Sequence, residues 1–130
     1  MRVLVTGAGG QLGRELCGLY GVSAEVIGLD RRGLDVTDLA QCREAIAAWR
    51  PDAVIHAAAY TAVDRAEEEP DEAFRVNAAG TRNMVLAARE GRVKFCYIST
   101  DYVFDGRAAV PYNEYDTPNP LNVYGKSKLA

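Results

Sequence analysis

Apolar and polar positions change their spacing from one segment of the chain to the next, and this change predicts alternating strands and helices. Short apolar runs, rich in β-branched and aliphatic residues, are typical of buried strands. The predicted strands are Arg2–Thr6, Glu25–Leu29, Ala53–Ala57 and Val93–Ile98. Between these runs, apolar residues recur at helical spacing. The predicted helices cover residues 11–20, 38–50 and 70–91, and a last, short one carries Tyr124 and Lys128.

The residues at the ends of these segments indicate where helices begin and stop. Thr37 stands where the N-cap of the second helix is expected, and Pro51 ends that helix. Pro70 suits the first helical position of the third helix, and Gly91 suits its C-cap. Residues 100–123 hold several turn-forming residues and predict a long loop.

Strands that alternate with helices predict a parallel sheet with right-handed crossovers. The strands are apolar without strict alternation, which is typical of a sheet covered on both faces. We therefore predict the α/β class, with a doubly wound parallel sheet in three α/β/α layers.

The composition agrees with a folded domain and excludes several kinds of partner. Hydrophobic residues make up 48% and charged residues 25% of the 130 positions, and the formal charge is −3. We expect no nucleic-acid partner, because no basic run is present, and no membrane partner or signal peptide, because apolar runs are short. Cys17, Cys42 and Cys96 lack a metal-ligand spacing, which predicts reduced cysteines in a cytoplasmic protein and no metal site.

The first strand leads into a glycine-rich turn that opens the first helix. Gly7, Gly10 and Gly13 follow a G-x-x-G-x-x-G pattern. Glycine permits positive φ and close approach of a pyrophosphate, and the helix N-terminus supplies free N–H groups and partial positive charge. The position between strand and helix predicts a Rossmann-type dinucleotide site. Its predicted cofactor residues are Gly7, Gly10, Gln11, Leu12 and Gly13.

The second strand ends at a carboxylate that predicts the ribose contact. Asp30 lies 20 residues after Gly10, where an acid accepts hydrogen bonds from the adenosine ribose. This position favours NADH, whereas a guanidinium at Arg31 suits the 2′-phosphate of NADPH. The alternative for the arginine is a solvated turn, so both cofactors stay open. Asp35 and Val36 are expected beside the adenine.

Tyr124 and Lys128 form a Y-x-x-x-K pair, which places both side chains on one face of a helix. A nearby cation favours the phenolate and eases proton exchange, and the same lysine can hold the cofactor ribose. Alone, such a pair is more often a surface pair. Ser99 and Thr100 follow the fourth strand, at the edge where open parallel sheets bind ligands. Turn capping is the alternative role for these hydroxyls.

Five segments together resemble the extended short-chain dehydrogenase/reductase family, and within it the dTDP-4-dehydrorhamnose reductases. They are Gly7–Gly13, His56–Asp64, Asn77–Asn83, Ser99–Gly106 and Tyr124–Lys128.

The resemblance implies a role for several residues. The implied catalytic residues are Thr100, Tyr124 and Lys128. The implied cofactor lining adds Ala57, Ala58, Ala59, Tyr124 and Lys128. The implied substrate contacts are Thr61, Val63, Thr100 and Tyr102. His56 would belong to the scaffold, and Asn77 would lie near the active site or hydrogen-bond locally within its helix.

The implied reaction is the NADPH- or NADH-dependent reduction of the 4-keto group of dTDP-4-dehydro-L-rhamnose, a nucleotide-sugar substrate, to dTDP-L-rhamnose. A 4,6-dehydratase of the same superfamily would carry Glu where Tyr102 stands, and a 4-epimerase fits the pattern less well. A non-catalytic, NADP-binding regulatory subunit of the methionine adenosyltransferase type is a third alternative.

Family members are more than twice as long as this chain. Residues 1–130 are therefore expected to form the NAD(P)-binding domain, truncated before a C-terminal substrate domain and inactive alone. A homodimer is also expected from the resemblance. Some members bind Mg²⁺ between subunits; Glu15 lies in the matching helix, where a solvated charge is the favoured alternative.

Overall fold

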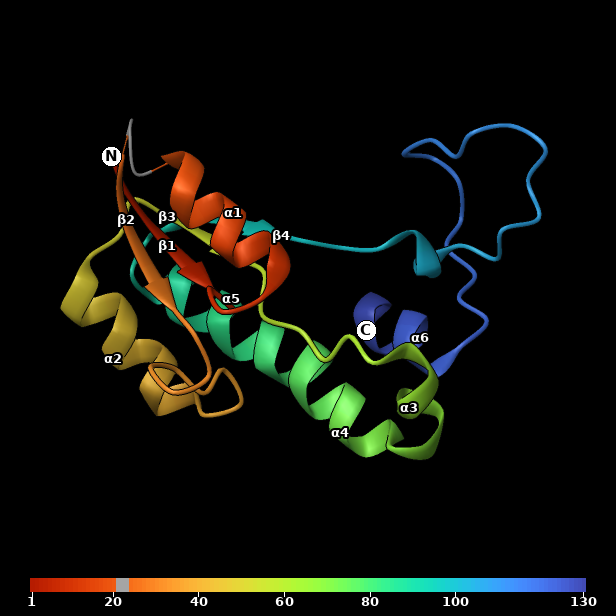
Figure 1. Ribbon diagram of the computed structural model, residues 1–130, viewed down its shortest axis with the longest axis horizontal. Helices are drawn as coiled ribbons and strands as arrows, with labels where there is room; N and C mark the ends of the chain where they lie inside the picture. The colour runs from red at the N-terminus through yellow and green to blue at the C-terminus, as the bar shows by residue number, and fades with distance from the viewer. Residues whose placement is uncertain (21–23) are drawn as a thin grey trace. The chain divides into compact units, whose positions relative to one another are not determined.

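The computed structural model describes residues 1–20 and 24–130 (Figure 1). The chain divides into two compact units. The first unit comprises Met1–Ala59 and Ala79–Ile98, and the second comprises Tyr60–Ala78 and Ser99–Ala130.

The first unit contains a four-stranded parallel sheet with the strand order β2-β1-β3-β4. Its strands are β1 (Arg2–Thr6), β2 (Glu25–Leu29), β3 (Ala53–His56) and β4 (Lys94–Tyr97). All four lie within predicted segments. β3 ends one residue earlier than predicted, and β4 is one residue shorter at each end.

Helices cover both faces of this sheet, as predicted for a doubly wound α/β fold. They are α1 (Gln11–Tyr20), α2 (Leu39–Trp49) and α5 (Thr81–Glu90). Figure 1 shows α1 on one side of the strands and α2 and α5 on the other. On the α1 side, a Cβ at Gly28 of β2 would lie only 2.8 Å from Cys17 Sγ of α1. This close packing requires glycine at that strand position.

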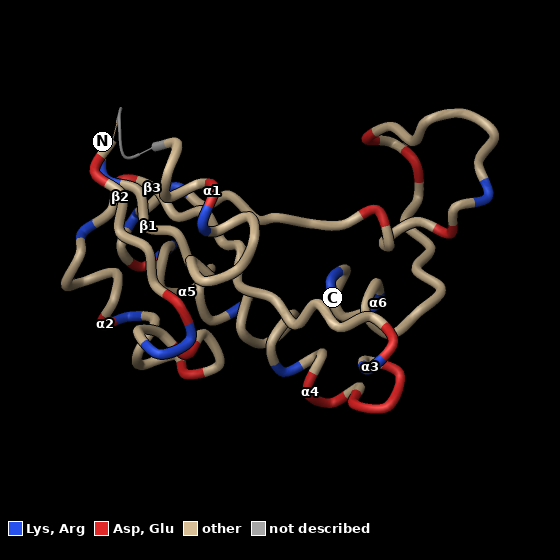
Figure 2. The backbone as a smooth tube through the Cα atoms, viewed as in Figure 1, with Lys and Arg blue, Asp and Glu red and all other residues tan. Residues whose placement is uncertain are grey.

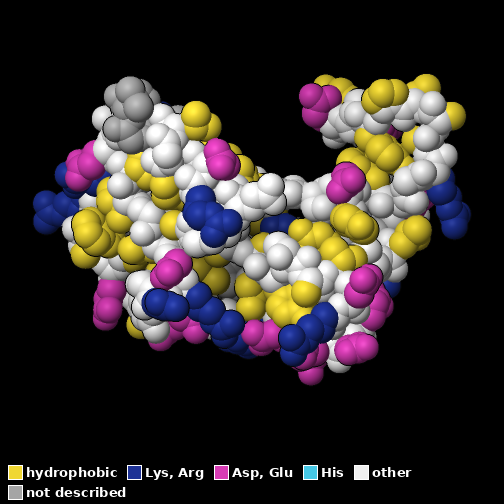
Figure 3. Space-filling model, in the orientation of Figure 1, with side chains coloured by type: hydrophobic (Ala, Val, Ile, Leu, Met, Phe, Trp, Pro, Cys, Tyr) yellow, Lys and Arg dark blue, Asp and Glu magenta, His cyan; other side chains and the backbone are white. Residues whose placement is uncertain are grey.

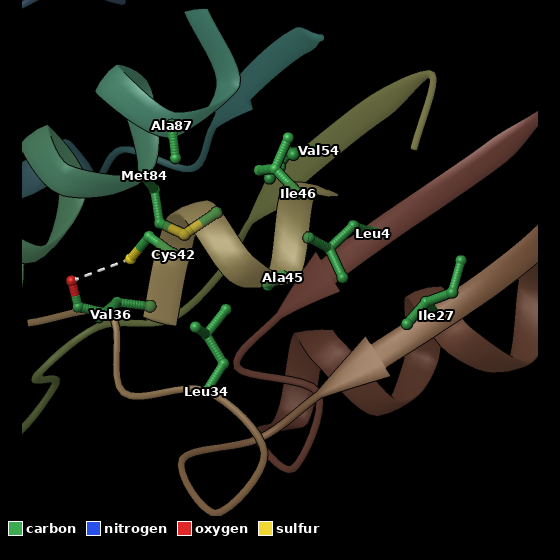
Figure 4. Close-up of a cluster of buried hydrophobic side chains, with 10 residues drawn as sticks. All are labelled: Leu4, Ile27, Leu34, Val36, Cys42, Ala45, Ile46, Val54, Met84 and Ala87. Carbon is green, nitrogen blue, oxygen red and sulfur yellow. Dashed lines mark hydrogen bonds between the residues drawn. The ribbon is translucent and has the colours of Figure 1, made fainter. Parts of the chain in front are cut away.

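The main apolar core lies between the sheet and the α2–α5 layer (Figure 4). Leu4 pairs with Ile27 on one neighbouring strand and with Val54 on the other, so these side chains share one face. Their partners are Cys42, Ala45 and Ile46 from α2 and Met84 and Ala87 from α5. The strands form continuous apolar runs in the sequence because strands that are buried on both faces need no polar positions.

The start of α2 corrects one prediction. Its N-cap is Asp38, not Thr37, and the Asp38 carboxylate accepts hydrogen bonds from the backbone N of Ala40 at 2.8 Å and of Gln41 at 3.3 Å. Thr37 is engaged elsewhere, because its N–H and hydroxyl both donate to Asp35 Oδ1, at 2.9 and 2.8 Å.

The second unit is built from short helices. They are α3 (Val63–Glu68), α4 (Pro70–Phe74), a 3₁₀ turn at Asp101–Val103 (η2) and α6 (Val123–Leu129). Its small core comprises Ala66, Ala73 and Tyr124, with Tyr60, Val63 and Val123 packed against them. The sequence did not predict α3.

The helix predicted over residues 70–91 is helical from Pro70 to Glu90 but is not one regular α-helix. A π-helical stretch, Arg75–Gly80 (η1), follows α4 and leads into α5. Gly91 is the C-cap of α5, as predicted, and the next residue, Arg92, takes the left-handed conformation at φ 56°.

The surface of the second unit carries two distinct regions. Acidic residues gather on α3 and α4 (Figure 2): Asp64, Glu67, Glu68, Glu69, Asp71 and Glu72. Hydrophobic side chains are exposed on the loop between η2 and α6 (Figure 3), where Val110 and Tyr115 are 72% and 94% exposed. Within the described part of the chain, no helix combines the length and the apolar character needed to span a membrane.

Candidate functional site

The glycine-rich turn after β1 has contacts that only glycine permits. Gly7 has φ 70°, and a Cβ there would lie 2.7 Å from the backbone N and Cα of Ala58. A Cβ at Gly13 would collide with the carbonyl oxygen of Gly7 and lie 2.7 Å from Ala8 Cα. Gly10 N donates to Gly7 O at 2.9 Å. The turn therefore holds the start of α1 directly against the ends of β1 and β3.

The outer side of the same turn presents bare backbone to solvent. Gly9, Gly10, Gln11 and Leu12 are all exposed. The first N–H groups of an α-helix have no intrahelical acceptor and carry the positive end of the helix dipole. Exposed glycines in front of such a helix fit a pyrophosphate, which needs close backbone approach and N–H donors.

Asp30 lies beside this turn at the end of β2. A Cβ at Gly9 would be 3.4 Å from Asp30 Cβ. Asp30 Oδ1 accepts hydrogen bonds from the backbone N of Arg32 at 2.9 Å and of Gly33 at 3.2 Å, which fix the carboxylate at the strand end. The side chain is exposed, as are those of Arg31 and Arg32. This placement suits an acceptor for ribose hydroxyls.

The segment carrying Asp35 and Val36 is held by side chains that the sequence did not single out. Asp35 N donates to Gln41 Oε1 at 3.1 Å. The Val36 carbonyl accepts from Asn83 Nδ2 at 3.1 Å and from Cys42 Sγ at 3.4 Å. Burial, helped by nearby acidic charges, raises the pKa of the Cys42 thiol to about 11, so it stays protonated as this bond requires. Two helices thus fix the predicted adenine contact.

His56 belongs to the scaffold of the first unit, as expected. It is fully buried. Its Nδ1 is hydrogen-bonded to Thr6 Oγ1 at 2.8 Å and its Nε2 to Thr81 Oγ1 at 3.1 Å. Thr6 Oγ1 also accepts from Ala58 N at 3.3 Å, which fixes the segment Ala57–Ala59 next to Gly7.

Tyr124 and Lys128 lie one turn apart in α6 of the second unit. They are only 9% and 6% exposed. Burial lowers the pKa of Lys128 to about 8, because an ammonium group loses hydration there. The ring of Tyr124 meets the ring of Tyr102 edge-on, with centroids 5.7 Å apart.

The predicted substrate contacts also fall in the second unit. Thr100 caps η2: its hydroxyl accepts from Tyr102 N at 3.2 Å and donates to Asp101 Oδ1 at 3.1 Å. Thr61 is exposed, whereas Val63 packs against the small core around Tyr124. Of the predicted residues, Thr100, Tyr102, Tyr124 and Lys128 therefore share one unit, and the glycine turn, Asp30, Asp35, Val36 and Ala57–Ala59 share the other.

Asn77 makes long-range rather than local hydrogen bonds, so the local alternative is wrong. Its Oδ1 accepts from Tyr60 N at 2.8 Å, and its Nδ2 donates to Tyr60 O at 3.0 Å and to Ser127 Oγ at 2.9 Å. Asn77 therefore joins the start of the second unit to α6.

Glu15, the residue considered for Mg²⁺, is an exposed side chain on α1. Among residues 1–20 and 24–130, no group of three or more His, Cys, Asp or Glu side chains is arranged to hold a metal ion.

Comparison with known proteins identifies the family of this chain. A protein-family model described as "RmlD substrate binding domain" matches residues 1–130. The dTDP-4-dehydrorhamnose reductase of Streptomyces griseus is 47% identical over 130 residues, which are 99% of this chain and 43% of that protein. The chain spans less than half the length of the curated relatives that it matches first.

Two solved structures show the same fold. The dTDP-4-dehydrorhamnose reductase of Bacillus anthracis, in complex with NADP, is 43% identical with a TM-score of 0.95 and covers 98% of this chain and 46% of that chain. The UDP-glucose 4-epimerase of Brucella ovis, in complex with NAD, is 28% identical with a TM-score of 0.90 and covers 98% of this chain and 44% of that one.

The fold is thus a Rossmann-like parallel α/β fold of the kind found in NAD(P)-binding short-chain dehydrogenase/reductases. The chain belongs to the RmlD family, in agreement with the resemblance seen in its sequence motifs.

Proposed function

We propose that the protein reduces the 4-keto group of a nucleotide-linked 6-deoxyhexose, dTDP-4-dehydro-L-rhamnose, with NADPH or NADH. The observation that carries this proposal is the combination of an open glycine turn before α1 with a buried Tyr124–Lys128 pair in α6. The relatives named dTDP-4-dehydrorhamnose reductase, one of them solved with NADP, support the same reaction.

Residues 1–130 supply the NAD(P)-binding domain in this proposal. The turn from Gly7 to Gly13 holds the pyrophosphate, Asp30 accepts from the adenosine ribose, and Asp35 and Val36 contact the adenine. Arg31 is exposed next to Asp30 and is available to a 2′-phosphate, which supports use of NADPH beside NADH. The exposed backbone of the turn fits either cofactor, because both share the pyrophosphate.

The cofactor supplies the hydride when it is bound. Tyr124 donates the proton to the carbonyl oxygen of the sugar. Lys128, one turn further along α6, remains mostly charged at neutral pH with its pKa of about 8; it stabilises the phenolate left after proton transfer and holds ribose hydroxyls. The Thr100 hydroxyl hydrogen-bonds the same carbonyl, with Thr61, Val63 and Tyr102 as sugar-nucleotide contacts.

The test is NADPH oxidation by the full-length protein with dTDP-4-dehydro-L-rhamnose. Tyr124→Phe should lower kcat about 100-fold or more, because the proton donor is lost. Tyr115→Phe is the matched control, since Tyr115 is 94% exposed, and it should leave kcat unchanged. Near-normal turnover of Tyr124→Phe would refute the assigned role.

The same assay separates two other functions. Tight NADP binding without turnover would favour a regulatory, cofactor-binding subunit. The fold shared with UDP-glucose 4-epimerase favours epimerisation as the second candidate; in that case the C4 configuration of a nucleotide sugar would change without net consumption of NADPH.

A cytoplasmic location and a homodimer complete the proposal. Cys17, Cys42 and Cys96 are free, which agrees with a reducing compartment.

A further inference from the structure

The helix that carries Tyr124 and Lys128 is short and follows a long loop. α6 has seven residues, Val123–Leu129, and a helix of this length is not stable by itself in water. Its position therefore depends on side chains from other elements of the second unit.

Glu67 on α3 provides one such contact. Its Oε1 accepts a hydrogen bond of 2.8 Å from the backbone N of Val123, the first residue of α6. Asn122, the N-cap, accepts from Gly125 N at 2.7 Å. A carboxylate at a helix N-terminus also meets the positive end of the helix dipole, and a hydrogen bond to a charged acceptor is stronger than a neutral one.

Ser127 provides a second contact, in the middle of α6. It is fully buried, and its hydroxyl donates to the Tyr124 carbonyl at 2.8 Å while it accepts from Asn77 Nδ2 at 2.9 Å. The Asn77 amide is itself fixed by two bonds to the Tyr60 backbone. The middle of α6 is thus tied to the Asn77 amide, whereas Asn122 and Glu67 make the hydrogen bonds of its first turn, beside the packing of Val123 and Tyr124 in the small core.

We propose that Glu67 is a positioning residue for the reaction. Through its bond to Val123 N it sets the first turn of α6, and thereby the orientation of the Tyr124 phenol relative to Lys128. This inference rests on the proposed function, because it concerns the helix that carries the proposed catalytic pair. No role for this glutamate follows from the sequence, where it is one of several acidic residues on α3 and α4.

The kinetic test uses the full-length protein with Glu67→Ala, Glu67→Gln and, as the matched control, Glu68→Ala. Glu68 is the neighbouring exposed residue of the same charge. Glu67→Ala should lower kcat about tenfold with KM for NADPH changed less than about twofold, since misplaced catalytic groups affect the chemical step. Glu67→Gln keeps an acceptor oxygen and should retain at least about half of kcat, and Glu68→Ala should match the wild type.

Hydrogen exchange gives a second readout that does not need turnover. The amides of Val123–Leu129 should exchange faster in Glu67→Ala than in Glu68→Ala, because the first turn opens more often. Equal exchange in these two variants, or equal kcat losses in Glu67→Gln and Glu67→Ala, would overturn the proposal. If the wild type does not oxidise NADPH with the sugar nucleotide, the proposed function fails, while the exchange result still decides the role of Glu67.

Discussion

Lys128 combines a charged group with nearly complete burial, and this combination has a cost in stability. Desolvation lowers its pKa from 10.5 to about 8. A lysine whose pKa falls on folding destabilises the folded state. This cost is complete below about pH 8, where the lysine is charged in both the folded and the unfolded state. The cost fades as the pH rises from about 8 to 10.5, because the folded state has then released its proton and the free energy of removing a proton from the unfolded chain falls with rising pH.

We therefore predict that Lys128→Met stabilises the cofactor-free protein and abolishes reduction. At pH 7 the free energy of unfolding should rise by about 2 kcal/mol, since the buried charge is removed and the stem is kept. Urea unfolding at pH 7 and pH 10 measures this, and the gain should be smaller at pH 10. A variant less stable than the wild type at pH 7 would contradict the prediction.

For single side chains, the residue types of the site could be predicted from the sequence more readily than their hydrogen-bond partners. Asp30 lies at the end of β2 beside the glycine turn, a position that the strand and turn patterns predict, and its contact with ribose stays a prediction. The N-cap of α2 was assigned to Thr37 instead of Asp38, since both residue types cap helices and only the hydrogen bonds of Asp35 distinguish them. The hydrogen bonds of Asn83 and Glu67 could not be predicted from the sequence, because each side chain bonds to backbone about 50 residues away.

The start of α1 packs against the glycine turn at Gly13. Gly13→Ala should weaken NADPH binding at least about tenfold and lower stability, because the new Cβ collides with the Gly7 carbonyl and must push α1 away from the turn. NADPH affinity is measured by fluorescence titration and stability by thermal unfolding.

Gly18→Ala is the control within the same helix. A Cβ at Gly18 meets nothing within 4 Å, so this variant should bind NADPH normally and gain about 0.5–1 kcal/mol from better helix propensity. If Gly13→Ala behaves like Gly18→Ala, then close packing of α1 on the turn is not what the site requires.

Elements with a strong apolar pattern were predictable, and elements that depend on tertiary packing were not. The four strands follow directly from their apolar runs, because both faces of the sheet are covered. α3 has six residues, too few for a clear helical period, and its packing around Ala66 helps to stabilise it. Leu12, Leu16 and Leu19 recur at helical spacing and predict the helix. Leu12 and Leu19 are, however, 42% and 72% exposed, so this apolar face is not the one that meets the sheet.

The residues proposed for cofactor binding and those proposed for catalysis belong to different units of the molecule. The glycine turn and the residues proposed for ribose and adenine belong to the first unit, whose main apolar core lies between the sheet and the α2–α5 layer. The Tyr124–Lys128 helix and the sugar contacts belong to the second, whose core comprises only three buried side chains and three partly buried ones. Since stability follows buried apolar area, the second unit should be the less stable of the two.

This asymmetry predicts the behaviour of residues 1–130 expressed alone. The polypeptide should bind NADPH, because the turn and its supports are all present in the first unit, and bound cofactor should raise its Tm. It should not reduce the sugar nucleotide at a significant rate, because the relatives that it matches are more than twice as long and the second unit has only a small apolar core. Titration calorimetry and the NADPH oxidation assay test both statements on one sample. Substantial turnover would show that residues 1–130 are sufficient for catalysis, and absence of NADPH binding would show that the glycine turn needs further chain for its structure.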